Sequence, residues 1–72
     1  MPDLPHLSDM SPLEILRLAI QREEEAFAYY RDAHEQIKEP STRQVLKDLM
    51  AEEQKHKVKL EKELYDHFYT EM

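Results

Sequence analysis

Apolar residues recur along most of the chain with the period of an α-helix. In the first half, one face is formed by positions spaced alternately three and four residues apart: Leu13, Leu16, Ile20, Glu23, Phe27, Tyr30, His34 and Ile37. In the second half the same spacing continues through Leu46, Leu49, Glu53, His56, Leu60 and, one residue late, Leu64. Such spacing is typical of amphipathic helices. The pattern predicts two helices, over about 12–38 and 41–67.

The expected ends of these helices carry the residues that begin and end helices. Ser11 is a good N-cap, Pro12 suits the first helical position, and Glu14 completes a capping box. The first helix should end near residue 39, because the residue before Pro40 is disfavoured in a helical conformation. The run 41–44, Ser-Thr-Arg-Gln, offers a second capping box, and the alternative is that Pro40 is itself the first helical residue.

The connection between the helices is only two or three residues long, so the helices must be antiparallel neighbours. We therefore expect an N-terminal arm over 1–10, extended or mobile, a helical hairpin over 11–68, and a C-terminal tail over 69–72. A lone hairpin buries only one strip of apolar surface. The predicted fold is all-α: a hairpin that pairs with a second copy, most simply through a twofold axis, to form a four-helix bundle.

Composition also indicates that a single hairpin needs additional stabilisation. A chain of 72 residues forms one domain with a marginal core, and such domains usually need disulfides, a metal or oligomerisation. Cysteine is absent, which excludes disulfides and cysteine-ligated metal sites. Oligomerisation and a metal held by Glu and His side chains remain open. Glycine is also absent, and the prolines lie only at positions 2, 5, 12 and 40, which favours long helices.

Charge and hydropathy exclude several classes of function. The net charge of −6 argues against a nucleic-acid partner, because phosphate binding needs a basic surface. No apolar run approaches the ~20 residues of a membrane span. The N-terminus lacks the basic and then apolar pattern of a signal peptide. We therefore expect a cytoplasmic protein.

Three ionisable residues occupy apolar positions of the predicted helices: Glu23, Glu53 and His56. In an antiparallel hairpin that turns near residue 39, residue n faces roughly residue 79 − n, so Glu23 faces position 56. At ~1.5 Å rise per residue, all three residues lie within about one helical turn of each other. An ionised Glu is costly to bury unless it is paired or bound to a metal. The sequence therefore indicates a metal site in this layer.

The spacing of Glu53 and His56 specifies the kind of site. Glu-x-x-His on one helix, with a Glu from a neighbouring helix, is half of the ligand set that four-helix bundles use for two iron or manganese ions. Two hairpins related by a twofold axis would supply four carboxylates and two imidazoles. We expect two Fe ions per dimer, because this ligand set favours iron or manganese, with zinc or cobalt as substitutes.

Beyond these features, two segments resemble a known family. AIQREEEAFAYYRDAHE, followed by PSTRQVLKDLMAEEQKH, is similar to the first half of the ferritin-like domain of rubrerythrins. It is equally similar to the short two-helix ferritins, among them the encapsulated ferritins. The resemblance covers about residues 13–64. Its most specific elements are Glu23, the aromatic pair Tyr29 and Tyr30, and Glu53-x-x-His56.

The resemblance implies roles for individual residues. Glu23 and Glu53 would be metal ligands, Glu53 bridging, and His56 a terminal ligand. Tyr30 would lie beside the site as a hydrogen-bonding group. The implied activity is oxidation of Fe(II) by O₂ or peroxide at an intersubunit site of a homodimer or higher homo-oligomer. Two departures favour a simple ferroxidase over a rubrerythrin-type peroxidase: no cysteine-ligated iron domain can form, and Ala26 stands where some rubrerythrins have a further carboxylate.

Other interpretations of the same residues are simpler. The chain could be a non-catalytic, acidic dimerisation module in which the seam Glu and His residues pair with each other, or the N-terminal half of a longer rubrerythrin-type peroxidase. We expect Glu24, Glu25 and Glu52 to be solvated surface, with metal entry as a lesser alternative. His34 lies too far from Glu23 to join the site, and His67 is expected to pair with Glu63.

Overall fold

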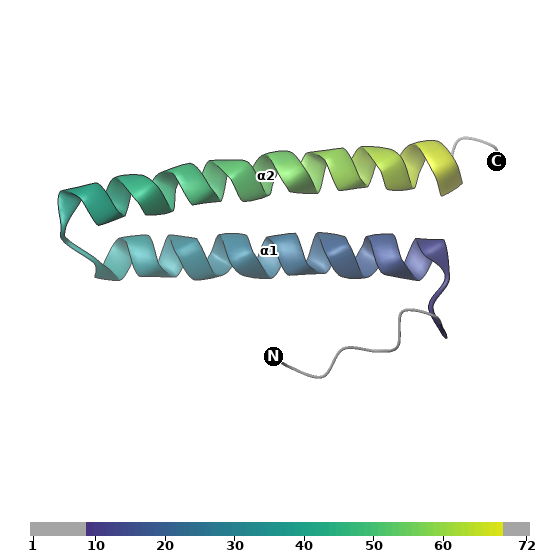
Figure 1. The fold of residues 1–72 in the computed structure, drawn as a ribbon, viewed down its shortest axis with the longest axis horizontal. Helices are drawn as coiled ribbons and strands as arrows, with labels where there is room; N and C mark the ends of the chain where they lie inside the picture. Colours follow the sequence, from purple (N-terminus) through teal and green to yellow (C-terminus); the bar gives the residue numbers. More distant parts are fainter. Residues whose placement is uncertain (1–8, 69–72) are drawn as a thin grey trace.

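The computed structural model describes residues 9–68, which form two antiparallel α-helices joined by a short connection (Figure 1). Helix α1 spans Pro12–Gln36 and helix α2 spans Pro40–Phe68. The helices pack against each other along their length, and the described part of the chain contains no strand. The predicted all-α, two-helix fold is confirmed. The predicted arm over 1–10 and the tail over 69–72 lie mostly or wholly outside the described residues.

Helix α1 begins at the predicted residues. The Ser11 hydroxyl oxygen accepts a hydrogen bond from the backbone N–H of Glu14 (3.1 Å), and the Ser11 carbonyl accepts one from Ile15 (3.0 Å). Pro12 occupies the first turn, where its missing N–H costs nothing. These contacts satisfy donors that a helix N-terminus would otherwise leave without partners.

Helix α1 ends at Gln36, two residues before the expected 38, because Ile37 is already extended (φ −88°, ψ 134°). The arginine at position 43 of α2 stabilises this end. Its Nη1 donates to the carbonyl oxygens of His34 (2.6 Å) and Ile37 (2.9 Å). The last carbonyls of a helix have no partners within the helix, so Arg43 acts as a cap supplied by the other helix.

Helix α2 begins at Pro40, one residue before the expected 41. The prediction of a capping box at Ser41 is wrong, and the alternative with Pro40 as first helical residue is right. The cap is Glu39: its carboxylate accepts hydrogen bonds from the backbone N–H groups of Ser41 (3.1 Å) and Thr42 (2.7 Å). Hydrogen bonds from the Thr42 and Ser41 side chains, and then from their backbones, lower the pKa of Glu39 to about 2.

The hairpin is a single layer of helices. Its smallest dimension is 13 Å, close to the ~10–12 Å diameter of one helix with its side chains. Among residues 9–68, no side chain is fully buried, and Tyr29, Val45, Val58 and Tyr65 are more than half exposed. The two helices therefore do not enclose a core of their own.

Within the described residues, neither helix is apolar enough over sufficient length to cross a membrane.

Candidate metal centre

Glu23, Glu53 and His56 meet near the middle of the hairpin. Glu23 lies on α1, and the other two lie on α2. One potential ligand atom from each residue lies within 4.8 Å of the corresponding atoms of the other two, and no other group of three or more such side chains occurs among residues 9–68. The structure brings together the three residues that the sequence analysis selected. Their role as ligands stays a prediction.

Two features of the sequence produce this convergence. Glu53 and His56 are three residues apart, so α2 places both on neighbouring parts of one face. The short connection, with Glu39 and Arg43 fixing the two helix ends, sets the axial register that brings Glu23 to the same level. The length of the connection sets this register. The position of the centre along the helices is therefore determined by the connection, which is at the other end of the hairpin from the N- and C-termini of the chain.

The Glu23 carboxylate is more deeply placed than His56, with 21% of its side chain exposed against 53%. Its Oε2 atom is buried and has no hydrogen-bond partner within the described chain. The nearest imidazole nitrogen, Nδ1 of His56, lies 3.6 Å away, beyond hydrogen-bond distance. Two atoms that each bind one ion at ~2.1 Å can lie up to ~4.2 Å apart. The spacing therefore fits a shared cation better than a direct hydrogen bond.

The two carboxyl groups also affect each other. A hydrogen bond to Glu23, then burial, then repulsion by the Glu23 charge raise the pKa of Glu53, and the neighbouring His56 opposes this. Two carboxylates this close repel each other when both are ionised. A divalent cation would remove the same repulsion. The donor set of two carboxylates and one imidazole fits iron, manganese or zinc.

The two sides of the hairpin differ at the level of the centre. On one side, the Lys57 ammonium approaches the Glu24 carboxylate at 3.9 Å and links the helices. On the other side lies His56, whose side chain is 53% exposed. The centre is therefore covered by an ion pair on one side and open on the other.

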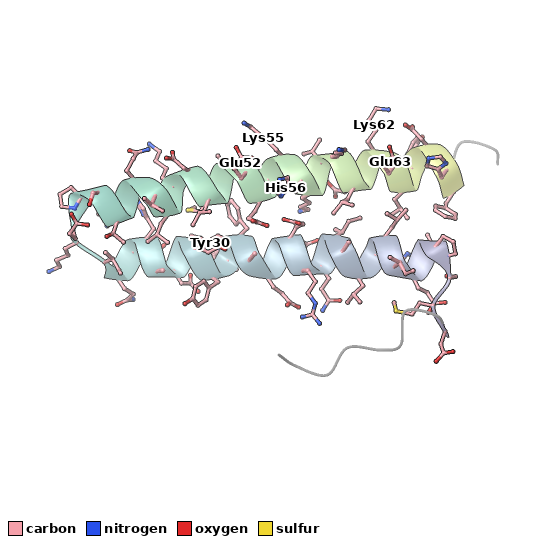
Figure 2. All side chains as sticks on the ribbon, in the orientation of Figure 1. Tyr30, Glu52, Lys55, His56, Lys62 and Glu63 are labelled. Atoms are coloured by element: carbon pink, nitrogen blue, oxygen red, sulfur yellow. The ribbon has the colours of Figure 1, made fainter. Side chains whose placement is uncertain are left out.

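Tyr30 lies on α1 in the middle part of the hairpin, whereas Lys55 and Lys62 project outward from α2 (Figure 2). The Tyr30 side chain is partly buried, and its ring contacts that of Tyr29 edge to face, with centroids 5.8 Å apart. No hydrogen bond joins Tyr30 to the three residues of the centre in the part of the chain described. The predicted role of Tyr30 beside the site stays a prediction.

The two other histidines among residues 9–68 lie where the sequence analysis expected. His34 is partly buried at the turn, with its Nδ1 3.5 Å from Nη2 of Arg43, and it does not join the centre. His67 pairs with Glu63 at 2.9 Å. Two contacts beside the centre were missed: Glu24 with Lys57, and Glu52 with Nε2 of His56 at 3.9 Å. The i, i+4 spacing of Glu52 and His56 would have indicated the second one.

Comparison with known proteins adds one decisive observation. The rubrerythrin family model matches residues 14–72, which include both helices and all three residues of the centre. The chain belongs to the rubrerythrin family. No curated protein and no solved structure shows significant similarity to it. Residues 9–68 form only one helical hairpin. This is consistent with the expected resemblance to the two-helix ferritins.

Proposed function

We propose that this rubrerythrin-family chain binds iron at an intersubunit site and oxidises Fe(II) with O₂ or peroxide. Glu23, Glu53 and His56 of each hairpin are the ligands in this proposal. Two copies of the chain hold two Fe ions, which Mn or Zn can replace. Rubrerythrin-family domains typically bind iron, which supports this choice of metal.

The observation that carries the proposal is the buried Oε2 atom of Glu23. A buried carboxylate oxygen without a hydrogen bond is costly, and removing such a partner typically costs ~1–3 kcal/mol. Neither neighbour relieves this cost within the described chain, because Oε2 of Glu23 receives no hydrogen bond from Glu53 and the nearest nitrogen of His56 is 3.6 Å away. A cation between these side chains gives each of the three polar groups a partner.

A second copy of the chain is the proposed partner because one hairpin is incomplete in two respects. It supplies only three ligands, and it buries no side chain among the described residues. Helical periodicity places exposed apolar residues, Ile15 and Tyr29 on α1 and Val45 on α2, on the same side of the hairpin as His56. The Glu24–Lys57 ion pair marks the opposite side. A twofold partner on the apolar side would bury this face and complete the ligand set.

In this assembly the residues of the chain perform distinct tasks. Iron bound at the site would supply the electrons for reducing O₂ or peroxide. Glu23 and Glu53 would carry the negative charge that balances the cations. The second hairpin excludes bulk water from the open side. Tyr30, on α1 in the same part of the hairpin, would offer its phenol as a hydrogen-bond donor beside the site.

Anaerobic reconstitution with Fe(II) tests the proposal. We expect two irons per two chains by elemental analysis, a higher melting temperature, and tighter dimerisation, because the ligands come from both copies. Addition of O₂ should then produce the near-ultraviolet absorption of ferric iron while dissolved oxygen is consumed.

The competing interpretation, a non-catalytic dimerisation module, predicts different results. Dimers would form with the same affinity with and without metal, iron would not bind in fixed stoichiometry, and Glu53→Ala would change neither. Stoichiometric iron that is not oxidised faster than free Fe(II) would leave the metal site intact and reject the ferroxidase activity.

A further inference from the structure

An open pocket of about 380 Å³ lies at the connected end of the hairpin, where α1 is followed by α2 (Figure 1). Its lining comes from the last turn of α1 and the first two turns of α2: His34, Pro40, Arg43, Gln44 and Lys47. Two of these side chains are cations at neutral pH, a third is an imidazole, and none is a carboxylate. Small-molecule sites usually measure roughly 300–1,000 Å³, so this volume suits a small anion or a small molecule that carries one.

The positive charge of the lining contrasts with the chain as a whole, which has 16 Asp and Glu against 10 Lys and Arg. Further along α2, the lysines at positions 55, 57 and 62 each pair with a carboxylate. The Lys47 ammonium forms no ion pair within residues 9–68. It shares the pocket with the Arg43 guanidinium, and an anion between the two cations would replace their repulsion with attraction.

The acids nearest to the pocket in the sequence of α2 have other partners. The Glu39 carboxylate accepts hydrogen bonds from the backbone N–H groups of Ser41 and Thr42. The Asp48 carboxylate accepts one from the side-chain amide of Gln44 at 2.9 Å. Neither acid lines the pocket. The cations of the lining are therefore not neutralised by these carboxylates.

The Arg43 guanidinium is held in place before any ligand binds. Its Nη1 donates to the carbonyl oxygens of His34 and Ile37, and its Nη2 lies 3.5 Å from Nδ1 of His34. A guanidinium has more N–H donors than these contacts use. Lys47 lies one turn further along the same side of α2. A fixed planar donor group beside a flexible ammonium is an arrangement that suits phosphate oxygens.

We propose that this pocket binds a phosphate group, either free or carried by a small molecule. Arg43 and Lys47 supply the positive charge, and the His34 ring and the Gln44 amide border the same space. Pro40 is the only apolar residue in the described lining, so charge and hydrogen bonds select the ligand. A phosphate dianion gains more from two cations than a singly charged carboxylate does.

The pocket lies away from the proposed dimer contact. Arg43 and Lys57 are about four helical turns apart, so they share one side of α2. Lys57 marks the side of the Glu24 ion pair, whereas the proposed partner covers the side of His56. The proposed dimer leaves the pocket accessible, and phosphate binding requires no metal at the centre.

The experiment follows ¹H–¹⁵N spectra of the metal-free full chain during titration with sodium phosphate. Sodium chloride keeps the ionic strength constant, so that screening does not change along the titration. We expect saturable shifts confined to the backbone amides of residues 34–47. Shifts that do not saturate, or that spread evenly along both helices, would overturn the proposal.

Lys47→Met tests the site, and we expect it to raise the dissociation constant of phosphate about tenfold, because a charged hydrogen-bond donor is lost. Lys59→Met is the matched control: Lys59 is an exposed lysine of α2 that does not line the pocket and forms no ion pair within the described residues. It removes the same charge and should bind phosphate as the wild type does. Equal weakening in the two variants would show that general charge attracts phosphate, and the proposal would be wrong.

Two further titrations identify the source of the phosphate group. If glucose 6-phosphate saturates the same amides more tightly than inorganic phosphate, and glucose causes no shifts, the ligand is a phosphorylated small molecule. Equal affinity for both would assign the site to the phosphate group alone. If neither saturates these amides, the proposal is rejected. Because the protein is free of metal throughout, none of these outcomes depends on the proposed iron site, and circular dichroism checks that each variant keeps its helices.

Discussion

Charged side chains lie between the helices both at the turn and in the middle of the hairpin. Only at the turn do the charged groups find their hydrogen-bond partners within the same chain. At the turn, the carboxylate of Glu39 accepts backbone hydrogen bonds from α2, and the guanidinium of Arg43 donates to two carbonyl groups of α1. In the middle, Glu23 has a buried oxygen without a hydrogen bond, and it lies beside a second carboxyl group whose pKa it raises.

This difference distinguishes polar residues that stabilise the fold from those that we propose bind a ligand. At the turn, Glu39 and Arg43 each meet free backbone donors or acceptors. The centre instead combines two groups of the same charge with a histidine that is too distant for a hydrogen bond. Polar groups that stabilise a fold are expected to be satisfied within it. Unsatisfied ones of like charge indicate a cation.

Removal of a centre carboxylate should give the largest effect and the clearest test of this contrast. In Glu53→Ala, the metal-free protein should be as stable as the wild type or more stable, because the repulsion with Glu23 is gone. The stabilisation by metal should disappear; at a metal concentration 1,000-fold above Kd that is a loss of about 4 kcal/mol. Melting curves with and without Fe(II), under anaerobic conditions, provide the measurement.

Glu61→Ala is the control for this substitution, since Glu61 is an exposed carboxylate of α2 outside the centre. It should leave the metal-induced shift unchanged. An equal loss of the shift in both variants would mean that general negative charge, not the centre, binds the metal. A large loss of metal-free stability in Glu53→Ala would place Glu53 with the residues that stabilise the fold.

The open side of the middle region can be tested without metal. Tyr29 is 70% exposed and lies on the proposed contact face, so Tyr29→Glu would place a charge in the dimer interface. We expect the dissociation constant of the dimer, measured by sedimentation equilibrium, to rise at least tenfold. This corresponds to a loss of about 1.4 kcal/mol in the free energy of dimerisation. Val58 is 57% exposed but lies toward the opposite side, so Val58→Glu should have little effect. The reverse order of effects would place the partner on the other face.

At the turn, Arg43→Met should destabilise the fold and leave the metal centre intact. The substitution removes the charged donor of two carbonyl groups, and hydrogen bonds to charged groups contribute about 1.5–3 kcal/mol. We expect the melting temperature to fall with and without metal, by a similar free energy. Arg31→Met is the control, because Arg31 is exposed and its ion pair within residues 9–68 is with the adjacent Asp32. If Arg43→Met lost metal binding while it remained folded, the turn and the metal centre would not be independent of each other.

The smallest effect is expected from the cap of α2. Because hydrogen bonds lower the pKa of Glu39 from 4.5 to about 2, its contribution to stability is present above pH 4.5. That contribution is lost as the pH falls toward 2. Glu39→Ala should lower the melting temperature slightly at neutral pH, and its difference from the wild type should shrink between pH 4.5 and 2. A difference that does not depend on pH would show that the carboxylate charge has no part in the cap.

The sequence predicted the helices and the convergence of Glu23, Glu53 and His56 because both depend on simple periodicity. Regular spacing of three and four residues determines which side chains share a face, and a short connection determines which levels meet. The cap of α2 was harder to predict. Ser41 and Glu39 both suit a cap, and the choice depends on whether Pro40 is the first helical residue, which local preference alone does not decide.

The neighbours of the centre could not be predicted for a different reason. Lys57 and Glu24 are long side chains on different helices, and their contact depends on the rotation of each helix about its own axis. The distance between Glu52 and His56 depends on side-chain rotamers, which a spacing of four residues permits but does not fix. Residue spacing thus defines which groups can meet, whereas helix rotation and rotamers define which of them do.

A hairpin only 13 Å thick, with no fully buried side chain between residues 9 and 68, has a consequence for how the chain reaches its final state. Too little apolar surface is removed from water within one copy to offset the entropy lost on ordering the helices. In the proposed dimer, folding and association are therefore one concentration-dependent reaction. Dilution should lower the unfolding midpoint, and refolding from denaturant should follow second-order kinetics.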